Sequence, residues 1–224
     1  MFEPTAVDPA VELLAELAGS GRALELGIGT GRIALPLQRR GIEIAGIDLS
    51  QAMVDRLREK PGGASISMTI GDFATAQATG PFMVVYLVFN TIMNLTTQSA
   101  QVACFANAAS HLEPGGYFVI EVMTPDLRRL PPGQTAVPFR ISPTHWAFDL
   151  YDVATQEMSS NYVTITDGRA EYTSIPFRYI WPAELDLMAQ LAGLTLSDRW
   201  DGWTRQPFTS ESRQHVSVWQ KKAS

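Results

Sequence analysis

The sequence is poor in cysteine, in histidine and in clustered basic residues. Its single cysteine, Cys104, excludes an internal disulfide and a cysteine-based metal site, and we expect no bound metal. Lys and Arg total 17 against 23 Asp and Glu, which gives a net charge of −6, and no long basic cluster is present. Such a surface repels phosphate backbones, so nucleic acid is not an expected partner.

Long hydrophobic runs are also missing. The longest apolar stretch, Phe82 to Phe89, is far shorter than the roughly 20 residues of a membrane helix. The first residues of the chain include acidic groups and no basic one, unlike a secretion signal. With 46% hydrophobic and 18% charged residues in a chain of 224, the composition is typical of a globular protein with a real core. We therefore expect a soluble cytoplasmic protein, a single domain over residues 1–224, with no membrane partner.

The first half of the chain alternates short apolar runs with amphipathic stretches. This pattern is typical of a parallel sheet covered by helices. Ser50 is a good N-cap for a helix that reaches Lys60. The predicted strands cover residues 23–26, 42–47, 66–70, 82–89, 117–122, 194–200 and 214–220.

Residues 126–180 have a different texture. They contain several prolines and alternating runs at 146–153, 158–166 and 170–180. Asp167-Gly168 lies between the last two runs, and this dipeptide is a strong hairpin signal. We predict an antiparallel β insertion after the fifth strand, not a second domain.

The most informative segment is Glu25-Leu-Gly27-Ile-Gly29-Thr-Gly31, between a predicted strand and a predicted helix. Glycines let the backbone turn sharply and approach a ligand, and the helix start behind them offers free N–H groups to an anion. A nicotinamide fingerprint would place its third glycine where Arg32 stands, which argues against a dehydrogenase. A tight turn without a ligand is the alternative interpretation.

Acidic residues follow the next two predicted strands. Asp48 ends the second strand, where a carboxylate can accept hydrogen bonds from both hydroxyls of a ribose. After the third strand, Gly71-Asp72-Phe73 offers a carboxylate for an adenine amino group and a ring that covers the base. The alternatives are a helix-dipole role for Asp48 and a plain surface loop around Asp72.

Five ordered segments together resemble the class I S-adenosylmethionine-dependent methyltransferases. The matches are Glu25-x-Gly27-x-Gly29-x-Gly31, Asp48-Leu49-Ser50 with Met53, Gly71-Asp72-Phe73, Phe89-Asn90, and Leu112-Glu113-Pro114-Gly115-Gly116. Met83 departs from the pattern, since many relatives carry an acidic residue there. The resemblance implies an α/β fold, a Rossmann-like doubly wound sheet of seven strands with an antiparallel last strand. It also implies S-adenosyl-L-methionine as cofactor and S-adenosyl-L-homocysteine as product.

The same resemblance implies a set of cofactor contacts. The glycine turn would hold the methionine part, Asp48 the ribose, and Asp72 with Phe73 the adenine. The implied cofactor-binding residues are Glu25, Gly27, Gly29, Thr30, Gly31, Asp48, Leu49, Met53, Gly71, Asp72, Phe73, Val88, Phe89 and Asn90.

Candidate acceptor residues follow from where ligands bind open α/β sheets, beyond the carboxyl ends of the strands. Methyl transfer needs an aligned nucleophile and sometimes a base. His145 is the predicted base, and Tyr151, Tyr162 or an amine acceptor that needs no base are the alternatives. The predicted acceptor contacts are Asn94, Trp146, Tyr151, Tyr162, Trp203 and His215; a core role is the alternative for the aromatic ones.

These observations predict an enzyme that transfers a methyl group to an oxygen or nitrogen of a small molecule, with residues 126–180 capping the acceptor pocket. The added β segment resembles that of enzymes that methylate amino sugars and other secondary metabolites. A peptide or protein N-methyltransferase is the first alternative, favoured by an open, acid-lined pocket. A binding module or cyclase of the same fold, without methyl transfer, is the second. A monomer and a homodimer are both compatible with the sequence.

Overall fold

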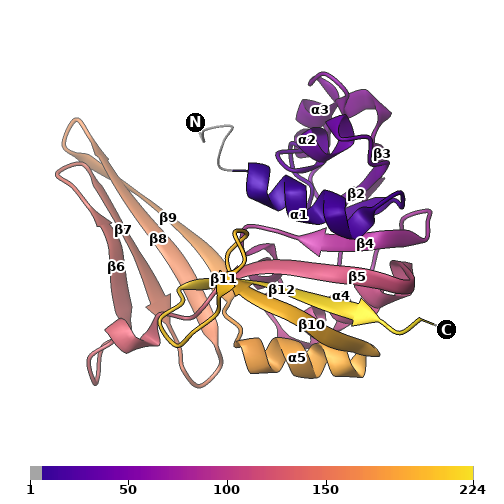
Figure 1. The fold of residues 1–224 in the computed structure, drawn as a ribbon. Helices are drawn as coiled ribbons and strands as arrows, with labels where there is room; N and C mark the ends of the chain where they lie inside the picture. The colour runs from indigo at the N-terminus through magenta and orange to yellow at the C-terminus, as the bar shows by residue number, and fades with distance from the viewer. Residues whose placement is uncertain (1–6, 224) are drawn as a thin grey trace.

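The computed structural model describes residues 7–223 and contains a main sheet with helices on both faces and a smaller sheet beside it (Figure 1). Its elements, in chain order, are α1 (Asp8–Ala18), β1 (Ala23–Leu26), α2 (Ala34–Arg39), β2 (Ile44–Asp48), α3 (Gln51–Arg58), β3 (Ser67–Ile70), β4 (Phe82–Leu87), the short 3-10 helix η3 (Thr91–Asn94), α4 (Gln98–His111), β5 (Leu112–Met123), β6 (Ala136–Ile141), β7 (His145–Tyr151), β8 (Glu157–Thr166), β9 (Arg169–Arg178), α5 (Pro182–Leu191), β10 (Leu194–Asp201), β11 (Gln206–Pro207) and β12 (Gln214–Lys221).

The main sheet has the strand order β11-β10-β12-β5-β4-β1-β2-β3. The pairs from β5 to β3 are parallel, whereas β12 is antiparallel to both of its neighbours. This arrangement confirms the predicted doubly wound sheet and its antiparallel last strand. The two-residue β11 adds a short eighth strand at the edge.

The helices cover the two faces of the main sheet in separate groups. Helices α1, α2 and α3 pack on the face that carries Val84 and Tyr86. Helices α4 and α5 pack on the opposite face, which carries Val85 and Leu87. Because successive strand residues point to opposite faces, the uninterrupted apolar run of β4 supplies both cores at once.

Local signals in the sequence also account for the element ends. The hydroxyl of Ser50 accepts a hydrogen bond from the Met53 N–H at 3.3 Å and caps α3 as predicted. Strand β5 begins at Leu112, directly after α4 and ahead of the predicted start at residue 117, and its register against β4 shifts across Pro114-Gly115-Gly116.

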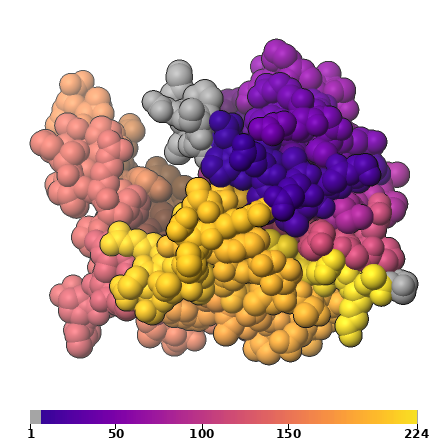
Figure 2. Space-filling model, viewed as in Figure 1, coloured from indigo at the N-terminus to yellow at the C-terminus, as the bar shows by residue number. Residues whose placement is uncertain are grey.

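The second sheet is antiparallel, in the order β6-β7-β8-β9, and leaves the body after the carboxyl end of β5. Asp167 and Gly168 adopt positive φ angles of 51° and 75° in the hairpin between β8 and β9, as the dipeptide predicted. Strand β6 was not among the predicted runs, because Pro138 interrupts its alternation and a proline in a run argues against a strand. Figure 2 shows the distal end of this sheet standing apart from the α/β body.

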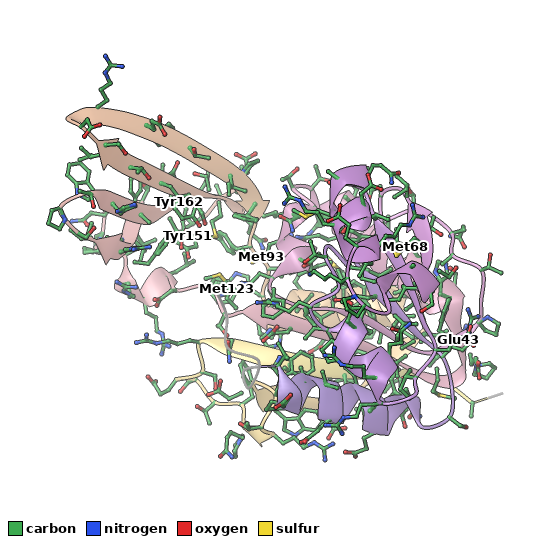
Figure 3. The ribbon with its side chains drawn as sticks, turned by 90° about the horizontal axis from the view of Figure 1, so that it is seen from above. Glu43, Met68, Met93, Met123, Tyr151 and Tyr162 are labelled. Atoms are coloured by element: carbon green, nitrogen blue, oxygen red, sulfur yellow. The ribbon has the colours of Figure 1, made fainter. Side chains whose placement is uncertain are left out.

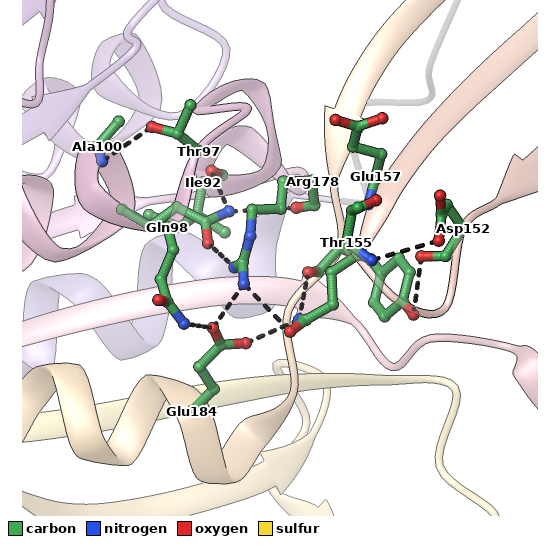
Figure 4. Close-up of polar contacts among 12 residues, drawn as sticks. Ile92, Thr97, Gln98, Ala100, Asp152, Thr155, Glu157, Arg178 and Glu184 are labelled. Carbon is green, nitrogen blue, oxygen red and sulfur yellow. Dashed lines mark hydrogen bonds and ion pairs between the residues drawn. The ribbon is translucent and has the colours of Figure 1, made fainter.

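A buried cluster of polar side chains joins the second sheet to the body (Figure 4). Arg178, at the end of β9, is 5% exposed. Its guanidinium donates to Gln101 of α4 at 2.5 Å, to Gln156 at 3.1 Å and to Glu184 of α5 at 2.8 Å. The cluster fixes the base of the sheet against two helices of the body.

Within residues 7–223, no helix combines the length and the hydrophobicity that a membrane crossing requires.

Candidate functional site

The glycine turn after β1 adopts a conformation that favours glycine at three positions. Gly27, Gly29 and Gly31 have φ angles of 72°, 57° and 75°. A Cβ on Gly27 would lie 2.6 Å from Cγ2 of Thr91, whereas a Cβ on Gly29 would meet nothing within 4 Å. The turn therefore packs against the loop after β4 at Gly27 and opens to free space at Gly29.

Asp48 ties this turn to the start of α3. Its Oδ2 accepts a hydrogen bond from the Gly29 N–H at 2.7 Å, and its Oδ1 accepts one from the Ser50 N–H at 2.8 Å. Each carboxylate oxygen retains further acceptor capacity. The position at the carboxyl end of β2 brings Asp48 to the edge of a cavity.

This cavity, which we call the cofactor cavity, has a volume of about 350 Å³. Asp72 binds the Ala74 N–H through Oδ1 at 2.8 Å, and the neighbouring Phe73 is only 9% exposed. Leu49 is 73% exposed at the cavity, and an exposed apolar side chain of this size suits a bound ring. The lining residues are Gly27, Asp48, Leu49, Asp72, Phe73, Thr91, Asn94 and Leu95.

Glu25 lies behind the turn and does not line the cofactor cavity. It is 2% exposed and accepts a hydrogen bond from the Tyr86 hydroxyl at 3.0 Å. Burial raises the pKa of Glu25 to about 8, against the opposing effects of the Tyr86 hydrogen bond and nearby Arg32. The structure thus places Glu25 as an internal support of the turn.

The loop between β4 and α4 begins with two strained residues. Phe89 and Asn90 have φ angles of 57° and 62°, a conformation that non-glycine residues rarely adopt. It is held by the Phe89 N–H, which donates to Oε2 of Glu121 at 2.9 Å, and by Oδ1 of Asn90, which accepts from the Met123 N–H at 2.6 Å. The Arg32 guanidinium lies over the Phe89 ring, 3.0 Å from its centre. Such strain is found at functional sites.

A second cavity, the inner cavity, lies where this loop and the end of β5 meet the second sheet. Its volume is about 270 Å³. Figure 3 shows Met93 and Met123 at the junction between the body and the sheet that carries Tyr162 and Tyr151. The lining residues are Phe89, Asn90, Met93, Met123, Phe139, Asp149, Met158, Ser160, Tyr162 and Phe177.

A third and larger cavity, the outer cavity, lies at the base of the second sheet. Its volume is about 630 Å³, and it shares no lining residue with the cofactor cavity. The lining residues are Thr96, Thr97, Thr135, Leu150, Tyr151, Asp152, Glu157, Met158, Ser159, Pro176 and Phe177.

The predicted acceptor residues of the second sheet lie on opposite faces of it, because side chains alternate along each strand. Asp149 pairs with Ser160 and Ala147 with Tyr162, whereas Trp146 pairs with Val163, so Tyr162 faces the inner cavity and Trp146 faces the other way. Tyr151, 3% exposed, belongs to the core and also contributes to the outer cavity.

His145, the predicted base, is exposed at the start of β7. Its Nδ1 lies 2.9 Å from the Thr144 hydroxyl, and it pairs with Thr164 near the distal hairpin. None of the three cavities is lined by His145. The geometry therefore does not favour it as the base.

His215 and Trp203 also lie outside the three cavities. His215 is fully buried, with Nδ1 2.8 Å from the Ser217 hydroxyl, and burial with nearby Arg199 lowers its pKa to about 3. Trp203 donates through Nε1 to Glu121 at 2.8 Å. Trp203 thus supports the loop after β4 through Glu121, which accepts from the Phe89 N–H, whereas the His215 side chain packs inside the protein against Phe208 and Ser217.

The remaining predicted cofactor residues lie in the turn itself or in the segments that follow β2, β3 and β4. The Thr30 carbonyl accepts from Lys60, and the Gly71 N–H donates to the Asp48 carbonyl at 3.0 Å. Val88 is buried, and Met53 is 40% exposed on α3. Asn94, predicted to contact the acceptor, lines the cofactor cavity, while Phe89 and Asn90, predicted to contact the cofactor, line the inner cavity.

Several cavity residues were not singled out from the sequence. Asp149 and Ser160 lie in two predicted runs, but the sequence did not indicate that they share a face, because this depends on the register between the two strands. The methionines gave no such signal, since apolar side chains in loops and strands are ordinary core residues. These residues are Met93, Leu95, Met123, Phe139, Asp149, Met158, Ser160 and Phe177.

Comparisons with known proteins agree on one chemistry. A family model described as a methyltransferase domain matches residues 23–116. The chain is 26% identical over 204 residues to the cypemycin N-terminal methyltransferase of a Streptomyces species, which covers 89% of this chain and 82% of that protein. It is similar to the solved structure of the CcbJ methyltransferase from Streptomyces caelestis, with a TM-score of 0.84 and 36% identity over 96% of this chain and 89% of that one. The S-adenosylmethionine-bound structure of CalS10, an amino pentose methyltransferase from Micromonospora echinaspora, aligns with a TM-score of 0.72 and 20% identity over 97% and 91% of the two chains.

Proposed function

The chain belongs to the class I S-adenosylmethionine-dependent methyltransferases, and from this premise we propose that it methylates an oxygen or nitrogen of a small molecule held in the inner cavity. The residues of the four-stranded sheet, within the 126–180 insertion, cap that acceptor. The observation that carries the proposal is the position of the inner cavity next to the cofactor cavity.

The two cavities share one short loop. Phe89, Asn90 and Met93 line the inner cavity, and Thr91 and Asn94 line the cofactor cavity. Successive residues of the same turn thus face opposite sides. A cofactor and an acceptor bound in the two cavities would meet across this loop, as direct transfer between them requires.

The residues of the cofactor cavity fit S-adenosyl-L-methionine. A Cβ on Gly29 would enter open space next to Asp48, so the missing side chain leaves room for a ligand. We propose that Asp48 accepts from the ribose hydroxyls, that Asp72 and Phe73 hold the adenine, and that the turn holds the methionine part. When bound, the cofactor supplies a sulfonium-linked methyl group.

The protein itself must align the acceptor with the methyl group and exclude water. Met93, Met123 and Met158 form apolar walls in the inner cavity, which keep competing water out. Asp149 and Tyr162 are its titratable side chains, so an acceptor with a free lone pair, or one that gives a proton to Asp149, suits this environment.

A peptide amine is the second candidate acceptor, favoured by the outer cavity. This cavity is larger than the inner one, and Asp152 and Glu157 contribute acidic side chains to it. It would suit the cationic or polar body of a longer acceptor. The similarity to an N-terminal methyltransferase supports the same candidate.

Binding and turnover test the proposal in sequence. S-adenosyl-L-homocysteine at about a hundred times its dissociation constant should stabilise the protein by about 2.7 kcal/mol, seen as a raised Tm, and NADH should have no effect. Labelled S-adenosyl-L-methionine should then transfer its methyl group to a component of a metabolite extract, or of a peptide extract for the second candidate. Stabilisation by NADH alone would overturn the cofactor assignment.

A matched pair of glycine variants tests whether the Tm shift caused by S-adenosyl-L-homocysteine comes from binding at the glycine turn. Gly29→Val should abolish the Tm shift, because the new side chain fills ligand space at a φ of 57°. Gly41→Val introduces the same side chain at a φ of 89°, also with nothing within 4 Å of the Cβ, but after α2 and outside the cavity linings. The Gly41 variant should keep the shift; equal loss in both would attribute it to backbone strain.

A further inference from the structure

The inner cavity contains one charged side chain among its ten described lining residues, and that residue is Asp149. We propose that Asp149 binds the ammonium group of an amine acceptor, which makes the enzyme an N-methyltransferase of ring-bearing or apolar amines. This inference rests on the proposed function and names the acceptor class of the same cavity.

The carboxylate is aimed by its cross-strand partner. Asp149 of β7 and Ser160 of β8 stand opposite each other in register, and both line the cavity. The Ser160 hydroxyl donates to Oδ1 of Asp149 at 2.6 Å. This bond fixes the orientation of the carboxyl group and leaves Oδ2 for a ligand.

The charge of Asp149 is not neutralised by an ion pair within residues 7–223. The cation that acts on it is Arg129, whose guanidinium binds the Asp126 carboxylate at 3.4 Å and the Pro138 carbonyl at 2.9 Å. Asp149 is half-buried, and this burial raises its pKa against the effects of Ser160 and Arg129. A half-buried carboxylate without a paired charge favours a ligand that brings one.

The rest of the cavity wall also suits a cation with an apolar body. Phe139 and Tyr162 form an edge-to-face pair with ring centres 6.0 Å apart, and both rings line the cavity together with Phe89 and Phe177. Aromatic faces attract ammonium groups, and the neighbouring methionines adapt to an irregular apolar ligand. A neutral alcohol would leave the carboxylate unpaired beside these rings.

Asp149 also accounts for a proton that an amine acceptor must lose. An ammonium nitrogen has no lone pair for the methyl group. Oδ2 of Asp149 takes one proton from it, which leaves a neutral amine beside a neutral carboxyl group, and the carboxyl group returns the proton to water.

Two probes of equal shape test the charge preference. N-methylbenzylamine is a cation at pH 7, and benzyl methyl ether is its neutral counterpart with the same number of heavy atoms. Ligand-observed NMR on protein saturated with S-adenosyl-L-homocysteine should give a dissociation constant at least about tenfold lower for the amine. Asp149→Asn should reduce this preference below about threefold.

Two further variants keep the test decisive. Glu171→Gln removes an exposed acid of the same sheet, in β9 and outside the cavities, and should keep the full preference for the amine. Ser160→Ala leaves the carboxylate but frees its orientation, and should lower the preference by about two- to fivefold; it replaces Asp149→Asn if that variant fails to fold.

The possible outcomes distinguish a failure of the amine assignment from a failure of the proposed methyltransferase function. Equal binding of amine and ether by the wild-type complex overturns the amine assignment and leaves the methyltransferase intact. A preference that survives Asp149→Asn overturns the role of that residue. Failure of S-adenosyl-L-homocysteine to raise the Tm contradicts the proposed function before any acceptor probe is added.

Discussion

At the scale of single residues, the carboxylate of Asp48 holds two backbone segments and still faces a cavity. It accepts from Gly29 at 2.7 Å and from Ser50 at 2.8 Å, and it lines the cofactor cavity. We expect Asp48→Ala to weaken binding of S-adenosyl-L-homocysteine by about one to three powers of ten. The reason is that each hydrogen bond to a charged acceptor contributes about 1.5–3 kcal/mol, and each 1.4 kcal/mol is about tenfold. Calorimetric titration measures the change.

Asp55→Ala is the matched control for Asp48→Ala. Asp55 lies on α3, exposed, and accepts from the Gln51 side chain at 2.7 Å. Its removal should leave the affinity unchanged. If Asp48→Ala lowers the Tm but binds the ligand as the wild type does, the carboxylate serves the turn alone.

The contrast between Asp48 and Asp149 shows which site residues a sequence predicts. Asp48 stands at the carboxyl end of a strand in the repeating strand–helix pattern of a parallel sheet. Its place at the edge of the sheet could therefore be predicted from the sequence alone. Asp149 lies inside a strand, where its direction depends on alternation and its surroundings on the register with β8. His145 was predicted from its chemistry and from its place in the insertion, and neither indicates which end of a strand meets the body.

At the scale of elements, the junction cluster around Arg178 decides how the second sheet meets the body. Arg178→Met leaves Glu184 and Gln101 without their shared donor. We expect a loss of about 3–5 kcal/mol in the free energy of unfolding, the usual cost of leaving one partner of a buried ion pair. Chemical denaturation measures the loss. Binding of S-adenosyl-L-homocysteine to the folded variant should stay within about a few-fold, since the cluster lies outside the cofactor cavity.

Arg129→Met provides the comparison for the Arg178 variant. Arg129 is exposed and pairs with the part-exposed Asp126 at 3.4 Å, and ion pairs at the protein surface contribute about 0–1 kcal/mol. An Arg178 variant as stable as the Arg129 variant would show that the cluster does not anchor the sheet.

The elements themselves were predicted as well as their local signals allowed. The parallel strands of the main sheet follow short apolar runs, and Ser50 and Asp167-Gly168 determine a helix start and a hairpin by local geometry. Strand β6 could not be predicted because it depends on pairing with β7 around a register shift near Pro138, and tertiary pairing outweighs local preference there.

At the scale of the whole molecule, two buried groups, Glu25 and His215, change the free energy of unfolding with pH in opposite directions. Burial raises the pKa of Glu25 from 4.5 to about 8. Burial, with Arg199, lowers the pKa of His215 from 6.5 to about 3. Between pH 4.5 and 8 the unfolded chain ionises Glu25 while the folded chain keeps it protonated, so this group lowers stability as pH rises. Between pH 6.5 and 3 the unfolded chain protonates His215 while the folded chain keeps it neutral, so this group lowers stability as pH falls.

Together, Glu25 and His215 predict a pH range in which the Tm is nearly constant. Between pH 4.5 and 6.5 the slopes from Glu25 and His215 are opposite and cancel, so the Tm of the cofactor-free protein should be nearly constant there. Above pH 6.5 His215 no longer offsets Glu25, and the Tm should fall until about pH 8. Below pH 4.5 His215 acts, and Glu184, whose hydrogen bonds with Arg178 and Gln156 hold its pKa low despite burial, adds to the fall.

Substitution of Glu25 separates its contribution to the pH dependence of the Tm from that of His215. Glu25→Gln keeps an acceptor for the Tyr86 hydroxyl and removes the ionisation, so its Tm should rise from pH 4.5 to 6.5 and then stay level to pH 8. Since one unit of pKa separation corresponds to about 1.4 kcal/mol, the change is large enough for differential scanning calorimetry across this range. A wild-type Tm that rises between pH 6.5 and 8 would contradict the neutral, buried state of Glu25.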